Sequence, residues 1–68
     1  MPVRKNEIYR QVKPAWLPPR YVKVISVYLY ELCYVRCEAR GELILHSTRQ
    51  TMTFENFLRK FSLHGHVV

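Results

Sequence analysis

Apolar and polar residues alternate with a period of two along much of the chain, the pattern typical of β-strands that bury one face. In the segment 33–40, "CYVRCEAR", one face would hold the apolar residues Cys33, Val35, Cys37 and Ala39, and the other would hold Tyr34, Arg36, Glu38 and Arg40. This alternation predicts an antiparallel strand with an apolar face toward the core and a solvated face that carries Tyr34 and Arg36.

Two earlier segments also have strand character. Residues 20–30, "RYVKVISVYLY", are rich in the β-branched and aromatic side chains that suit strands. Their alternation is clear up to Val24, and from Ile25 onward both faces are apolar, which indicates either two covered faces or a β-bulge near Ser26; the bulge is favoured. The shorter, half-polar alternation of residues 7–13 is typical of an edge strand.

Between these two segments lies "PAWLPP", residues 14–19, which contains the one tryptophan of the chain. Prolines donate no backbone hydrogen bond and restrict the residue before them, so a stiff loop is expected here. Trp16 and Leu17 would either fold over the open end of a small core or anchor a partner, and the two roles can coexist.

The period changes in the last third of the chain. Residues 42–54 predict a further strand, broken near His46 and Ser47, and the phenylalanines and leucine that follow are spaced as one face of a helix over residues 54–61. Thr53 is the expected N-cap, Glu55 lies in the first turn, and Arg59 and Lys60 lie in the last, as the helix dipole favours. Residues 62–68 predict a last strand.

The order of these segments resembles that of the small Src-homology-3-like barrels, which include KOW and Tudor modules, and of short phage and prophage proteins. The matching pieces cover most of residues 7–68 and are "EIYRQV", "RYVKVISV", "CYVRCEA", "RQTMTF", "ENFLRKF" and "SLHGHVV". The resemblance implies a mainly β fold: a five-stranded antiparallel barrel over residues 7–68 with one short helical turn before the last strand. Residues 1–6, "MPVRKN", are expected to form a basic flexible tail before it. The proline-rich first loop and the lack of an acidic run depart from the peptide-binding members, so polyproline recognition is not expected.

Size and charge favour a binding module over an enzyme. A chain of 68 residues forms one domain with a small core. Its net charge of +6 and pI of about 9.8 suggest a nucleic acid or an acidic protein as partner, although charge can also serve solubility alone. There is no signal-peptide pattern and no apolar run of membrane-spanning length, so we expect a cytoplasmic protein that does not bind membranes.

The candidate nucleic-acid-binding residues are the basic and aromatic ones of the expected solvated face: Lys23, Tyr34, Arg36, Arg40 and Arg49. The cations would neutralise phosphates and Tyr34 would stack on a base. The alternative is an ordinary solvated face on which Glu38 partly neutralises its neighbours.

Two other interfaces are conceivable from the sequence. Trp16, Leu17 and Tyr21 could bind an acidic protein partner, which makes a protein-interaction module the alternative function. The uncharged segment Val24–Tyr30 would be hazardous if exposed, which suggests a homodimer or a self-assembling structural subunit formed through that region.

Catalytic and metal chemistry is not expected. Cys33 and Cys37 would lie about 13 Å apart on an intact strand, too far to form a disulfide or to share a metal ion with His64 and His66. They are expected to fill the core. The chain contains no Asp, so it lacks a Ser–His–Asp set, and we expect neither an enzyme nor a cofactor.

Overall fold

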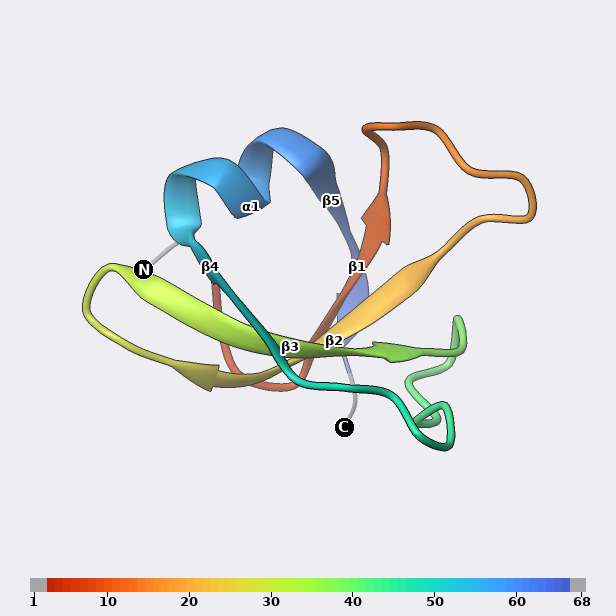
Figure 1. Cartoon of the computed structure of the whole chain (residues 1–68), viewed down its shortest axis with the longest axis horizontal. Coiled ribbons are helices and arrows are strands. Elements are labelled where there is room, and N and C mark those ends of the chain that lie inside the picture. The colour runs from red at the N-terminus through yellow and green to blue at the C-terminus, as the bar shows by residue number, and fades with distance from the viewer. Residues whose placement is uncertain (1–2, 67–68) are drawn as a thin grey trace.

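Five strands and one short helix follow one another in the computed structural model, which describes residues 3–66 (Figure 1). The elements are β1 (Glu7–Gln11), β2 (Tyr21–Val27), β3 (Glu31–Cys37), β4 (Gln50–Thr53), α1 (Phe54–Lys60) and β5 (Phe61–His66). All neighbouring strands are antiparallel, and their order in the sheet is β4-β3-β2-β1-β5. The mainly β class and the position of the helix before the last strand confirm the prediction.

The sheet is open and does not close into the predicted five-stranded barrel. β4 and β5 are its two edges, and no pairing joins them within residues 3–66. The chain passes from one edge to the other through α1, which covers the face of the sheet between them (Figure 1). Phe57 and Phe61 pack into the core from this connection and shield it without a closing ladder of hydrogen bonds.

β1 is an interior strand rather than the predicted edge strand. It pairs with β2 on one side and with β5 on the other, and it ends at Gln11. Ile8 and Tyr9 are both buried although they point to opposite faces. The half-polar pattern was misleading because Tyr9 buries its ring while its hydroxyl donates a hydrogen bond to Oε1 of Glu7 at 3.2 Å.

The predicted bulge in β2 is confirmed. Val24 pairs with Tyr34, but the next pair joins Ser26 to Cys33, so the register shifts between Val24 and Ser26. A bulge increases the local twist of the sheet. β2 ends at Val27, and the hairpin turns through residues 28–30, where the Tyr28 N–H donates to the Glu31 carbonyl at 2.7 Å.

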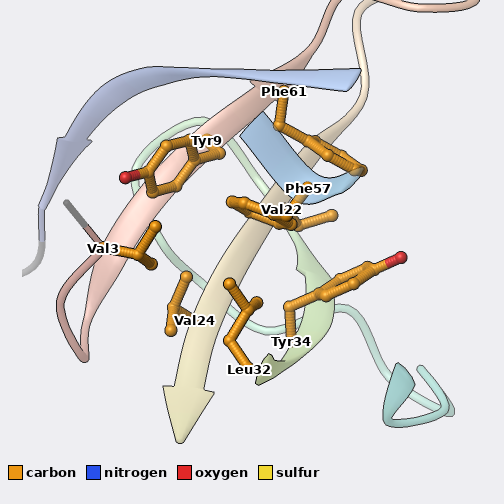
Figure 2. Packing of buried hydrophobic residues seen from close by; sticks show 8 residues of the cluster. All are labelled: Val3, Tyr9, Val22, Val24, Leu32, Tyr34, Phe57 and Phe61. Carbon is orange, nitrogen blue, oxygen red and sulfur yellow. The ribbon is translucent and has the colours of Figure 1, made fainter. Parts of the chain in front are cut away.

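An aromatic cluster fills the face of the sheet beneath α1 (Figure 2). The fully buried Phe57 ring lies 4.8 Å from Tyr9 in an edge-on arrangement and stacks on Phe61 at 4.6 Å between centroids. Val22, Val24, Leu32, Tyr34 and Val3 complete this cluster. Such ring contacts stabilise beyond the area they bury, which suits a chain with little room for a core.

The prediction for the two faces of β3 is confirmed for the face of Val35 and Cys37, which is buried, and is wrong for the face of Tyr34. Tyr34 belongs to the core and is only 6% exposed, while Val35 and Cys37 are buried on the opposite face and Cys33 is half-buried there. The alternation itself is real, but both faces of β3 are largely covered. A pattern with apolar residues on one side and a tyrosine on the other does not say which side meets the helix.

The segment before β1 packs against the sheet. Val3 is buried in the core, and the Asn6 N–H donates to the Val24 carbonyl at 2.8 Å. The Arg4 N–H donates to Oε1 of Glu7 at 2.6 Å. Residues 1 and 2 of the predicted tail lie outside the described residues, and from Val3 onward the segment is part of the fold.

The predicted helix is confirmed with its capping residues. The Thr53 side chain accepts a hydrogen bond from the Asn56 N–H, and Arg59 pairs with Glu55 at 2.8 Å. β4 is much shorter than the predicted strand, and residues 38–49 form a long loop in which His46 adopts a φ of 67°. Residues 67–68 of the predicted last strand lie outside the described residues.

Candidate functional site

A cavity of about 270 Å³ opens where the aromatic core reaches the end of the sheet. Its apolar lining is formed by Val22, Met52 and Phe61, and its polar lining by Gln11, Tyr34 and Gln50. Three cations complete the lining: Arg20 before β2, Arg36 near the end of β3, and Lys60 at the end of α1. We refer to this hollow as the basic cavity.

The strand alternation explains how Arg36 reaches this site. Leu32, Tyr34 and Arg36 share one face of β3, and the first two are buried in the core while Arg36 is exposed at the rim. Among the described residues, no Asp or Glu lines the cavity. Within residues 3–66 none of the three cationic head groups takes part in an ion pair. The cavity is therefore an uncompensated positive site, which attracts anions.

Trp16 holds Arg20 in place at the rim. The Arg20 guanidinium lies 3.5 Å from the centroid of the Trp16 ring, a cation–π contact. The loop that carries Trp16 is tied to the cavity at both ends: the Gln11 N–H donates to the Arg20 carbonyl, and the Val12 and Lys13 N–H groups donate to the Lys60 carbonyl. Trp16 thus packs on a cation of the site and is not among the buried core residues.

Tyr34 offers its hydroxyl to the cavity and not its ring. The ring packs against Phe57 and Phe61 at 5.4 and 5.5 Å between centroids, and its burial raises the pKa of Tyr34. The hydroxyl points away from the other labelled side chains in Figure 2 and donates to Oε1 of Gln50 at 3.4 Å. The predicted presentation of this ring on a solvated face is therefore wrong, although the residue lines the site.

The predicted nucleic-acid-binding residues separate into three places. Tyr34 and Arg36 line the basic cavity. Lys23 pairs with Val35 on the opposite face of the sheet. Arg40 and Arg49 are exposed in the loop of residues 38–49, outside the lining of the cavity.

The predicted partner-binding residues are also divided. Trp16 and Leu17 lie in the proline-rich loop, where Leu17 is 96% exposed. Tyr21 lies on the face of Lys23, with its ring 4.8 Å from that of His64. The proposed self-contact region is partly unavailable, since Val24 is fully buried and only Tyr28, Leu29 and Tyr30 at the hairpin tip are exposed.

Sequence reasoning missed Arg20, Lys60, Gln11 and Gln50 as members of the site. Lys60 was expected only as a cation in the last turn of the helix, and Arg20 only as the first residue of the strand-like segment 20–30. Each of these residues lies at the end of an element, and no local pattern shows that those ends meet.

A second hollow of about 280 Å³ adjoins the basic cavity. It is lined by residues 44–48 of the long loop together with Arg36 and Gln50, which also line the basic cavity. β3 continues to Cys37 while β4 begins only at Gln50, so the main chain of Arg36 bonds to the loop instead of to a strand. Its N–H donates to Oγ of Ser47 at 2.8 Å, and its carbonyl accepts from the Ile44 N–H at 3.3 Å.

Both cysteines are free, and burial raises the pKa of the Cys37 thiol. Cys33 Sγ lies 3.3 Å from Oγ1 of Thr51. Within residues 3–66 no group of three or more His, Cys, Asp or Glu side chains is placed to hold a metal ion.

No protein-family model matches the chain, and no curated protein or solved structure matches it either. Among residues 3–66 there is no helix with the length and apolar character needed to cross a membrane.

Proposed function

We propose that this chain is a non-enzymatic nucleic-acid-binding module that contacts the phosphate backbone at the basic cavity. The observation that carries the proposal is the convergence of Arg20, Arg36 and Lys60, from three separate segments of the chain, on one hollow that no carboxylate side chain of residues 3–66 lines. Phosphate contacts supply most of the affinity in such complexes. The net charge of +6 over 68 residues would also attract a nucleic acid at longer range, which supports the same partner.

The three cations suit different parts of a phosphate contact. A guanidinium offers paired N–H donors that match two phosphate oxygens, whereas an ammonium acts as a compact charge. The contact of Arg20 with Trp16 reduces the entropy that this side chain loses on binding. Gln11, Gln50 and the Tyr34 hydroxyl can hydrogen-bond to the sugar or the base beside the phosphate.

We also propose that the module is a relative of the Src-homology-3-like barrels, in an open form, and that it serves as an accessory or regulatory protein of phage type. The strand order β4-β3-β2-β1-β5 and the helix before β5 support this relationship. Fold alone does not specify a function, so the binding proposal depends on the cavity.

Binding is tested by fluorescence anisotropy with labelled oligonucleotides at several salt concentrations. Three phosphate contacts predict a plot of log affinity against log salt with a slope of about −2 to −3. Arg36→Gln should weaken binding about tenfold and reduce the magnitude of that slope by somewhat less than one. Arg10→Gln is the matched control, because Arg10 is equally charged and exposed but points away from the face of Gln11.

Two results would contradict the proposal. One is no detectable binding at low salt. The other is an equal loss of affinity in Arg36→Gln and Arg10→Gln, which would show that only the overall charge matters and that the cavity is not the contact surface.

The alternative proposal is a protein-interaction module anchored at the proline-rich loop. It is favoured by Leu17, which is 96% exposed beside the partly exposed Trp16. Leu17→Ala separates the two functions, since it should abolish capture of an acidic protein and leave oligonucleotide affinity unchanged. Self-association through Tyr28, Leu29 and Tyr30 would appear as a concentration-dependent sedimentation coefficient.

A further inference from the structure

The basic cavity and the second hollow together form one continuous surface. Arg36 and Gln50 line both, so a ligand that leaves the first hollow passes directly over these two side chains into the second. The Arg36 main chain, where the two hollows meet, is held in place by its hydrogen bonds to Ser47 and Ile44. A ligand that uses both hollows must carry two different groups close together, one for each hollow.

The two hollows differ in chemistry. The first has three cations around its rim, as a phosphate requires. Of the described residues that line the second hollow, Arg36 is the only cation. The others present the half-buried Ile44, the exposed Leu45 and His46 side chains, and the hydroxyls of Ser47 and Thr48. Apolar, aromatic and hydroxyl groups of this kind are suited to the flat face and polar edge of a nucleobase.

From this pairing we propose that the ligand is single-stranded nucleic acid, with a phosphate in the basic cavity and an adjoining base unstacked into the second hollow. This inference rests on the proposed function and narrows its substrate. In a duplex the bases are stacked and paired inside, so that only the phosphates could reach this surface and the second hollow would stay empty. A single strand can turn one base outward without breaking a base pair.

Gln50 lies at the point where the strand would cross. Its Oε1 accepts the Tyr34 hydroxyl, and its amide N–H groups have no hydrogen-bond partner among residues 3–66. They are available to donate to a base oxygen or a sugar oxygen. His46 also lines the second hollow and has an exposed side chain, whose ring can stack on a base.

The test compares a labelled single strand of about twelve nucleotides, a length within the usual range of single-strand sites, with a duplex of the same length. Wild-type protein should bind the single strand at least about tenfold more tightly. His46→Gly removes the ring while suiting the positive φ of 67° at this position, so the fold is retained, as circular dichroism would verify. It should weaken single-strand binding about fivefold or more and leave duplex binding unchanged.

The outcomes separate this inference from the proposed function. Equal or tighter binding of the duplex, or a single-strand affinity unaffected by His46→Gly, would overturn the proposal that a base of a single strand enters the second hollow. The proposal that the basic cavity binds phosphate would stand. Failure to bind either oligonucleotide would overturn the proposed function and the inference with it. Thr48→Gln, which places a longer side chain in the same hollow, should reproduce the selective loss of single-strand binding.

Discussion

The role of the aromatic cluster is tested by replacing Phe57, the side chain at its centre. Phe57 is fully buried and its ring contacts those of Tyr9, Tyr34 and Phe61 at centroid distances of 4.8, 5.4 and 4.6 Å. A buried Phe→Ala substitution costs about 3–5 kcal/mol. A domain of this length has a free energy of unfolding of about 3–10 kcal/mol. Phe57→Ala should therefore remove much or all of the stability.

Phe57→Leu should lower the free energy of unfolding by a smaller amount that can be measured. It keeps an apolar side chain but removes three ring contacts, each worth about 0.5–1.5 kcal/mol. Because the leucine recovers part of the packing, we expect a loss of about 1–3 kcal/mol. Urea denaturation followed by circular dichroism measures this loss, with Trp16 fluorescence as a second probe of the same transition.

The control is Leu58→Ala, the next residue of the same helix. Its side chain is 42% exposed, and alanine has the higher helix propensity, so the free energy of unfolding should change by less than about 0.5 kcal/mol. A loss of less than about 0.5 kcal/mol in Phe57→Leu, or equal losses in the two variants, would refute the central place given to this ring.

Two further predictions concern buried titratable groups. Cys37 is buried with a raised thiol pKa and Cys33 is half-buried, so a thiol-specific reagent should label Cys33 first and Cys37 only as the protein unfolds; equal rates would contradict the burial. Burial, together with the charge and hydrogen bond of Glu7, raises the pKa of Tyr9 from 10.0 to about 12. The folded state thus holds a proton that an unfolded tyrosine releases, and the free energy of unfolding should fall as pH rises from about 10 to 12. Tyr9→Phe should remove this part of the fall, and an unchanged pH profile would contradict the assignment.

The features predicted correctly from the sequence are those that local residues determine. The helix follows from the spacing of Phe54, Phe57 and Phe61 and from the cap at Thr53, all within nine positions. The bulge follows from the loss of alternation after Val24. These signals depend on neighbours along the chain and not on the rest of the fold.

The errors arose where a long-range contact decides the outcome. β3 has apolar side chains on one face and Tyr34 on the other, and only the position of α1 makes Tyr34 a core residue. β1 looks half-polar, yet β5 returns from the far end of the chain to pair with it. Barrel closure failed for the same kind of reason, since α1 and its phenylalanines occupy the connection between the two edge strands.

The candidate site shows most clearly the difference between features set by neighbouring residues and features set by long-range contacts. Arg36 was predicted because it alternates on a strand, and it does line the cavity. Lys23 was grouped with it, but the register places Lys23 opposite Val35, on the other face. The end of α1 is held beside the segment that leads into the proline-rich loop, because the Val12 and Lys13 N–H groups donate to the Lys60 carbonyl.

The most direct test of the basic cavity as the binding surface is a titration of ¹⁵N-labelled protein with a short single-stranded oligonucleotide, followed by amide chemical shifts. We predict that the largest changes fall on Arg20, Arg36, Gln50 and Lys60, with the Trp16 indole N–H shifting alongside them. Changes centred instead on Ile8, Arg10 and Lys23, on the opposite face of the sheet, or no changes at low salt, would contradict it.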